Sequence, residues 1–209
     1  MTMNKRIFGA NLFPAVAVIA LLALGGTGTA VAGNGADDFV RSIGQQAINS
    51  LTGKELSDDQ RQAGFRTILK RNFELPLFAR FTLGRFWRRA SETQRKEFVG
   101  LFEDYLVQIY AALFRDYNGE SFTVGKVREI NKSDVAVKSS VTLNDGQKIE
   151  VYWRVRGKDD PKIIDVIVEG VSMVITQRDE FSAIISQNGG KLDGLLTALR
   201  KKTGKTPAL

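Results

Sequence analysis

The sequence of 209 residues contains neither histidine nor cysteine. Without histidine, Ser-His-Asp and Cys-His nucleophile systems, acid–base catalysis by imidazole and the usual zinc sites are excluded. Without cysteine, no disulfide can stabilise the fold even in an oxidising compartment, so the chain must depend on its core. These two absences remove most of the familiar catalytic and metal-binding arrangements.

A hydrophobic run long enough to span a bilayer is also missing. The apolar stretch Leu12–Leu24 is interrupted by Pro14 and is too short to cross a membrane comfortably. Lys5-Arg6 precedes it, and Ala30-Val31-Ala32 follows it as an A-x-A-type cleavage site. We therefore predict a secretory signal peptide over residues 1–32. An uncleaved membrane anchor is the alternative, but glycine and threonine residues end the apolar run early.

The charge balance is basic without being extreme. The formal net charge is +7, and loss of the two basic residues of the predicted signal peptide lowers it to +5. No arginine–glycine tract with interleaved aromatic residues is present, and an exported protein seldom meets nucleic acid. Attraction to anionic lipid headgroups fits this charge better.

Residues 36–118 are predicted to be helical. Apolar residues recur at helical spacing from Ala36 to Leu51. Ser57 and Ser91 are each followed three residues later by glutamine, which is the pattern of a capping box at a helix start. Pro76 suits the first turn of a further helix. The following aromatic-rich segment is interpreted as core or as the lining of an apolar cavity; its rings are Phe73, Phe78, Phe81, Phe86 and Trp87.

The longest helix is predicted to run from Ser91 to about Asp116. Its apolar stripe is wider than packing on one neighbour requires. The stripe comprises Phe98, Leu101, Phe102, Tyr105, Leu106, Ile109, Tyr110, Leu113 and Phe114.

From Glu120 the apolar period changes from 3.6 to 2, which predicts four antiparallel strands over residues 120–169. Asn144-Asp145-Gly146 predicts a hairpin with a type I′ turn. In the last strand the alternation places Ile164, Val166 and Val168 on the apolar face and Asp165 on the opposite face with Glu169.

Gly170 is predicted to end the sheet, and helices follow over residues 171–201. The predicted fold class is α+β, with one domain over residues 33–209. Its antiparallel four-strand twisted sheet is covered on one face by helices, and a cavity suited to an apolar ligand is expected between the two layers.

Asp165 and Glu169 are the best remaining candidates for a catalytic pair. Four residues apart on a strand, they would lie about 13 Å from each other, which is too far for a two-carboxylate site. We interpret them as outward residues that pair with arginine or lysine. No catalytic residue and no metal site is predicted.

The string D-V-x-V-E-G-V-S-M-V-x-x-x-R-x-E-F, from Asp165 to Phe181, resembles the MlaC family, also called the toluene-tolerance family. The resemblance extends from about Ala36 to Arg200. It implies a periplasmic phospholipid-binding protein that carries lipid between two membranes and hydrolyses nothing. It also implies three partners: phospholipid, an inner-membrane ring protein with an ABC transporter, and an outer-membrane lipoprotein–porin complex.

The resemblance does not transfer individual lipid contacts, so the candidates come from periodicity. Each is interpreted either as plain core or as a lipid-binding residue; they are Phe102, Tyr105, Leu106, Ile109, Val141, Val151, Trp153, Val166, Val168 and Val174. No cofactor is expected beyond the bound lipid, and a shuttle of this kind is expected to be a monomer. A polycyclic lipid of the hopanoid type, an exported enzyme without histidine and an adaptor with a solid core remain as alternatives.

Overall fold

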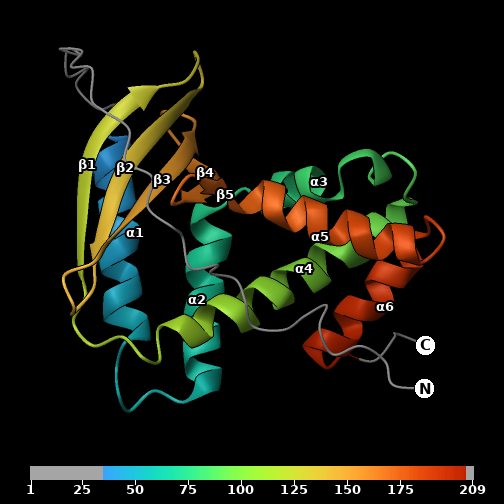
Figure 1. Cartoon of the computed structure of the whole chain (residues 1–209), viewed down its shortest axis with the longest axis horizontal. Coiled ribbons are helices and arrows are strands. Elements are labelled where there is room, and N and C mark those ends of the chain that lie inside the picture. Colours follow the sequence, from blue (N-terminus) through green and yellow to red (C-terminus); the bar gives the residue numbers. More distant parts are fainter. Residues whose placement is uncertain (1–34, 206–209) are drawn as a thin grey trace.

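The structure is a computed structural model that describes residues 35–205. The predicted signal peptide lies outside the described residues. In chain order the elements are α1 (Ala36–Leu51), α2 (Asp58–Asn72), α3 (Leu75–Leu83), η1 (Gly84–Phe86), α4 (Glu92–Leu113), β1 (Ser121–Glu129), β2 (Asp134–Thr142), β3 (Lys148–Arg156), β4 (Lys162–Val168), β5 (Val171–Ser172), α5 (Met173–Gln187) and α6 (Leu192–Thr203). Figure 1 shows the sheet at one end of the molecule and most of the helices at the other.

The α+β class and the antiparallel sheet are confirmed, with five strands in the order β1-β2-β3-β4-β5 in place of the predicted four. The fifth strand forms because the chain reverses at Glu169-Gly170, where φ is +49° and +80°, and Val171 pairs with Val168. Positive φ at both central residues is what a type I′ turn requires.

The predicted type I′ turn at Asp145-Gly146 is wrong. Gly146 has a φ of +85°, but Asp145 is not among the described residues with positive φ. The Leu143 N–H donates to the Gln147 carbonyl at 2.8 Å, and the Gly146 N–H donates to the Leu143 carbonyl at 2.9 Å. This pattern is a three-residue hairpin loop whose last residue is a left-handed glycine.

The predicted alternation of the fourth strand is also wrong at its start. Arg154 pairs with Asp165, but the next pair joins Val155 to Ile163, so Ile164 is an extra residue in β4. This bulge puts Ile163 on the core face with Val166 and Val168. Ile163 and Ile164 are both buried.

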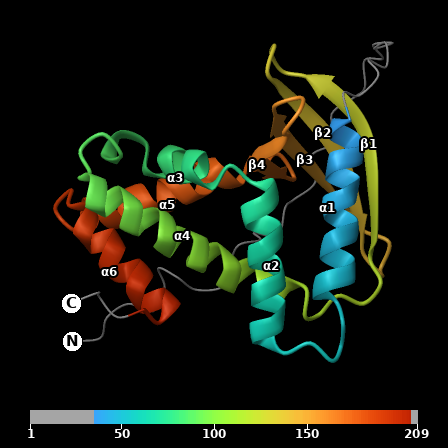
Figure 2. The ribbon, with the colours of Figure 1, turned by 180° about the vertical axis from the view of Figure 1, so that it is seen from behind.

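The helix that lies along the sheet is α1, next to β1 and β2 (Figure 2). Gly44 permits the close approach, because a Cβ atom at this position would lie 2.4 Å from the ring of Phe122. The buried residues Ala36, Val40, Val137 and Val155 form a small apolar cluster between α1 and the sheet.

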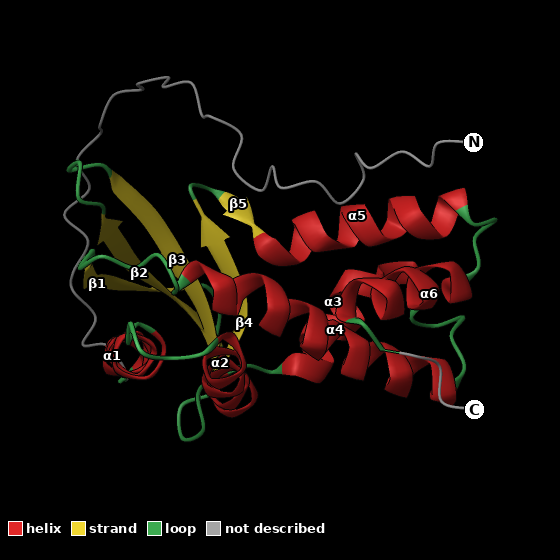
Figure 3. Ribbon diagram, turned by 90° about the horizontal axis from the view of Figure 1, so that it is seen from below, coloured by secondary structure: helices red, strands yellow, loops and turns green. Residues whose placement is uncertain are grey.

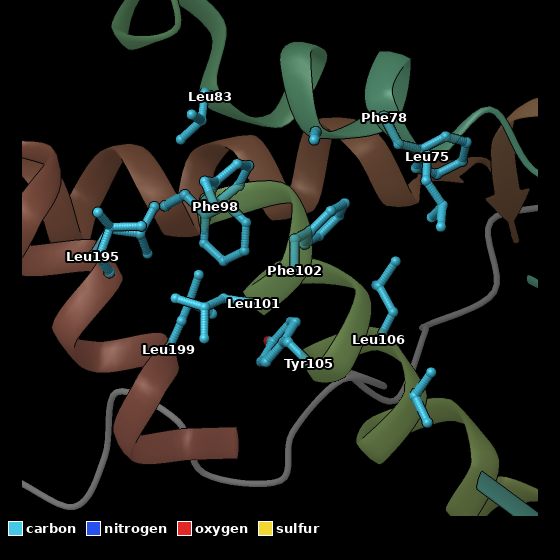
Figure 4. Close-up of a cluster of buried hydrophobic side chains, with 14 of the residues drawn as sticks. Leu75, Phe78, Leu83, Phe98, Leu101, Phe102, Tyr105, Leu106, Leu195 and Leu199 are labelled. Atoms are coloured by element: carbon cyan, nitrogen blue, oxygen red, sulfur yellow. The ribbon is translucent and has the colours of Figure 1, made fainter. Parts of the chain in front are cut away.

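The remaining helices pack mainly on one another. The long helix α4 contacts α2, α3 and α6 in place of the sheet. Its buried side chains join those of the other helices and Ile163 in a large apolar cluster, part of which Figure 4 shows. The helix α5 continues directly from β5 and runs away from the sheet (Figure 3). Within residues 35–205, no helix has the length and apolar character to cross a membrane.

Both predicted capping boxes are confirmed. Ser57 and Ser91 each accept a hydrogen bond from the backbone N–H of the glutamine three residues later, and each glutamine side chain accepts one in return. Pro76 lies in the first turn of α3 as predicted.

Candidate functional site

The candidate site is the part of the sheet's apolar face that α1 does not cover. Strand register places Val151 beside Val168 and Trp153 beside Val166 on this face. Val141 lies two strands from β4 and pairs with Ile149. Val151 is buried, whereas the side chains of the other residues are only half-buried. The face is therefore apolar and incompletely covered.

Trp153 connects this face to both apolar clusters. Its ring packs against both clusters and meets Phe122 edge-on, with 6.4 Å between ring centroids. Its Nε1–H donates to the Ser139 hydroxyl at 2.8 Å, and that hydroxyl donates to the Val151 carbonyl at 3.2 Å. The polar end of the indole is thus satisfied, as burial of tryptophan requires.

Three candidate residues of α4 lie in the helical core. Phe102 stacks on Phe98 at 5.6 Å between centroids and meets Phe181 edge-on at 5.8 Å. Tyr105 packs on the same Phe181 ring, and Leu106 is also buried. Figure 4 shows Phe98, Phe102, Tyr105 and Leu106 along one helix, within the cluster.

Ile109, on the next turn of α4, and Val174, in the first turn of α5, are half-buried at the edge of the large cluster. With Trp153 and Val166, which pack against the same cluster, they come from α4, α5 and the sheet. The structure therefore brings these four candidates to the margin of one cluster, while Phe102, Tyr105 and Leu106 lie inside it.

Sequence patterns did not predict a polar group that lies between α4 and α5. Gln177 is buried, and its Nε2–H donates to the Glu180 carboxylate at 2.5 Å. Burial raises the pKa of Glu180 above its usual value and raises the pKa of Tyr105 to about 12. The pKa of Tyr110 is raised by burial as well. Only the spacing of Gln177 and Glu180 on one helix face could have indicated such a pair.

The interpretation of Asp165 as an outward, ion-paired residue is wrong. Its side chain is buried and accepts hydrogen bonds from the Ser172 hydroxyl at 2.7 Å and the Val174 N–H at 3.3 Å. The bulge at Ile164 accompanies this placement. Asp165 therefore ties the start of α5 to β4. Glu169 is exposed and accepts a hydrogen bond from the Glu150 backbone N–H.

Two hollows lie on the described residues. One of about 40 Å³ lies at the end of the sheet, where the turn before β2 and the end of β3 meet Ala36 at the start of α1. The other, of about 210 Å³, is lined by η1, the start of α4 and the start of α6. Between the sheet and the helices, the large and small apolar clusters meet at Phe39 and Trp153, which pack against both.

Among residues 35–205, no group of three or more acidic residues could hold a metal ion. The site therefore consists of apolar side chains with a few satisfied polar groups. Such a surface suits an apolar ligand held by burial.

The fold is similar to that of the phospholipid-binding protein from Ralstonia solanacearum, solved in complex with a phospholipid. The TM-score is 0.73 at 19% sequence identity, over 81% of this chain and 97% of the other. In sequence, the chain is 27% identical over 110 residues to the toluene tolerance protein ttg2D of Pseudomonas putida. That match spans 52% of this chain and 51% of the relative, so about half the length of this relative is matched. The profile of the MlaC protein matches residues 41–201, and the chain therefore belongs to the MlaC family.

Proposed function

We propose that the chain is a periplasmic lipid carrier that binds the acyl chains of a phospholipid against the apolar face of β3 and β4. The observation that carries the proposal is the half-buried apolar face of Trp153, Val166 and Val168, which the chain's own helices leave incompletely covered. Membership of the MlaC family and the fold shared with a phospholipid-binding protein support it.

The energetics of transfer favour burial of the tails. Each buried CH₂ of an acyl chain contributes about 0.8 kcal/mol relative to water, so two long chains contribute on the order of 20 kcal/mol. A carrier that offers an apolar surrounding exchanges one such environment for another, and transfer from membrane to carrier is then nearly balanced. The headgroup remains at the opening of the site, where water can solvate its charge.

Entry of a lipid requires the two apolar clusters to separate. They meet at Phe39 and Trp153, which pack against both. We propose that the acyl chains enter beside Trp153, between the sheet with α1 and the remaining helices. In this arrangement the lipid contacts are Ile109, Val141, Val151, Trp153, Val166, Val168 and Val174, with Phe102, Tyr105 and Leu106 forming the floor.

The biological role that fits such a carrier is transport of phospholipid between an outer-membrane lipoprotein–porin complex and an inner-membrane ring protein with an ABC transporter. We propose that the protein acts as a monomer, needs no cofactor and catalyses no reaction on its cargo. A polycyclic lipid is a second cargo that the same apolar face could hold.

An adaptor without ligand is the second candidate function. The close packing of Phe98, Phe102 and Phe181 favours it, because these three rings contact one another with 5.6–5.8 Å between centroids. The two candidates differ in whether lipid accompanies the purified protein.

Native mass spectrometry of protein purified from the periplasm tests the proposal. The carrier is expected to have a mass that exceeds the delipidated form by one or more lipids, and the adaptor is expected to show no such difference. Val168→Glu places a carboxylate on the apolar face and is expected to abolish the lipid adduct.

Ile167→Glu is the matched control, because Ile167 pairs with Tyr152 on the opposite face of the same strand. It is expected to retain lipid. Loss of lipid in both variants with unchanged thermal unfolding, or in neither, would contradict the placement of the site.

A further inference from the structure

The end of the helical region farthest from the sheet is basic. The stretch from Leu75 to Ser91 contains four arginines and no acidic residue. It comprises α3 and η1 and leads to α4. Figure 1 shows α3 beginning near the sheet, whereas the segment after it and the turn between α5 and α6 lie at the end of the molecule opposite the sheet, and Figure 2 shows the same from behind.

The side chains of η1 and of the turn that follows it differ in exposure. Phe86 and Ala90 are buried, whereas Arg85, Arg88 and Arg89 are exposed. The three arginines therefore present their charges to solvent beside a buried apolar pair.

Two basic residues from other elements lie beside this turn. A Cβ atom at Gly84 would lie 2.9 Å from Nε of Arg178, so the guanidinium of this α5 residue packs over the start of η1. Lys191 lines the same hollow as Arg89. In that hollow Asp193 accepts a hydrogen bond from Gln94 at 2.9 Å. We call Arg85, Arg88, Arg89, Arg178 and Lys191 the distal basic cluster.

Within residues 35–205, the side chains of this cluster form no ion pair, and Arg85 only lies over the Phe86 ring at 5.0 Å. Other basic residues at the sheet do form ion pairs. Arg156 pairs with Asp134 at 2.6 Å, Lys162 pairs with Asp160 at 2.8 Å, and Lys138 pairs with Glu150. The distal arginines are exposed charges that form no ion pair within the described part of the chain.

Aromatic residues accompany the cluster. Phe81, four residues before Arg85, is 43% exposed, and Trp87 between the arginines is half-buried. Arginine attracts anionic headgroups, and phenylalanine and tryptophan favour the boundary between headgroups and acyl chains.

We infer that the distal basic cluster, with Phe81, binds the surface of an anionic lipid bilayer. A bilayer presents many phosphates with no fixed geometry, which suits arginines spread over one turn and two neighbouring elements. Bound in this way, the protein holds its sheet away from the membrane, where a protein partner can reach the sheet end of the molecule.

Sedimentation with vesicles tests this inference, using protein purified in its exported form. Wild-type protein is expected to bind vesicles of phosphatidylcholine with phosphatidylglycerol, to bind phosphatidylcholine alone weakly, and to be released by salt. Replacing three arginines, in the variant Arg85→Gln, Arg88→Gln and Arg89→Gln, is expected to lower the partition coefficient on the order of 100-fold. Phe81→Ser is expected to weaken binding while the salt dependence remains.

The matched control removes the same charge from the sheet end, in the variant Lys126→Gln, Arg128→Gln and Lys148→Gln. These residues are exposed and form no ion pair within the described part of the chain. The control is expected to bind anionic vesicles within a few-fold of wild type. Equal losses in both triple variants would overturn the inference, since net charge alone would then explain binding.

Wild-type protein that ignores anionic vesicles but binds immobilised polyglutamate would also overturn it, in favour of an acidic protein partner. Thermal unfolding confirms that each variant is folded. The amount of copurified lipid, measured in the same preparations, separates this inference from the proposed function: either property can be lost while the other remains.

Discussion

Asp165 joins β4 to α5 through its buried carboxylate. It accepts hydrogen bonds from Ser172, from the Val174 N–H and, at 2.9 Å, from the Val166 N–H. Asp165→Ala leaves these donors without this partner, and we expect a loss of about 1–3 kcal/mol in the free energy of unfolding. Urea denaturation measures it.

The control for this variant is Asp159→Ala, because Asp159 is an exposed turn residue. It is expected to change stability by less than about 0.5 kcal/mol. Equal effects of the two variants would mean that the hydrogen bonds of Asp165 do not contribute specifically to stability.

Asp134 makes stability depend on acid pH. The hydrogen bonds of Arg156 lower the pKa of this buried carboxyl from 3.8 to about 2. Because the folded pKa lies below the unfolded value, ionised Asp134 contributes to the free energy of unfolding above pH 3.8, and this contribution is lost as the pH falls toward 2. The contribution amounts to about 2 kcal/mol.

We therefore expect the difference in the free energy of unfolding between wild type and Asp134→Asn to shrink as the pH falls from 4 to 2. Denaturant titration at each pH measures this difference. Arg156→Gln, which removes the cause of the shift, is expected to flatten the acid dependence of the wild-type protein. A difference that stays constant over this pH range would refute the assignment.

At the residue scale, the period of two holds along β2 and β3 but fails at the start of β4. Val137, Ser139 and Val151 share one face because their strands pair without interruption. In β4, the extra residue Ile164 reverses the alternation before it. A bulge of this kind depends on tertiary contacts, here the capping of α5 by Asp165, which periodicity does not contain.

At the element scale, the helices whose starts carry local signals were predicted best. Ser57 and Ser91 cap their helices through bonds within four residues, so the sequence alone specifies them. The predicted type I′ turn is absent at Asp145-Gly146, and a pair of residues with positive φ lies at Glu169-Gly170, where no hairpin was predicted and a glutamate has to adopt positive φ. Residue preference does not predict that, because few glutamates adopt this conformation.

The contact of α1 with the sheet depends on Gly44. Alanine is favoured over glycine within a helix by about 0.5–1 kcal/mol, but overpacking costs about 1–3 kcal/mol. Because the added Cβ atom would lie 2.4 Å from the Phe122 ring, we expect Gly44→Ala to be destabilising by about 1 kcal/mol. Thermal or urea unfolding measures the change.

Gly100→Ala is the control, since a Cβ atom at Gly100 in α4 would have no neighbour within 4 Å. It is expected to stabilise the protein by about 0.5–1 kcal/mol. The second substitution Phe122→Leu is expected to reduce the cost of Gly44→Ala. If Gly44→Ala stabilised the protein as much as Gly100→Ala, the close approach of α1 would not limit packing.

At the scale of the whole molecule, the sequence did not predict which helix covers the sheet. The wide stripe of α4 packs on α2, α3 and α6 and on Phe181 of α5, and the shorter α1 lies on the sheet. Amphipathic stripes state how much surface a helix buries and not against which neighbour. The candidate residues of α4 and of the sheet consequently meet only at the margin of the large cluster.

That margin offers a spectroscopic test of lipid entry. The chain has two tryptophans. Trp153 contacts both apolar clusters, and Trp87 lies between the arginines of the distal basic cluster. If the clusters separate to admit acyl chains, lipid removal changes the surroundings of Trp153. In a Trp87→Phe variant we expect the fluorescence emission maximum to shift on delipidation and to return on reloading with phospholipid.

The Trp153→Phe variant reports on Trp87 alone. It is expected to show no shift under the same treatment, because the distal basic cluster takes no part in the separation of the two apolar clusters. A shift of equal size in both variants would indicate a change throughout the fold, and a shift in Trp153→Phe alone would move the lipid to the far end of the helices. Only separation of the clusters at Trp153 predicts a response confined to this residue.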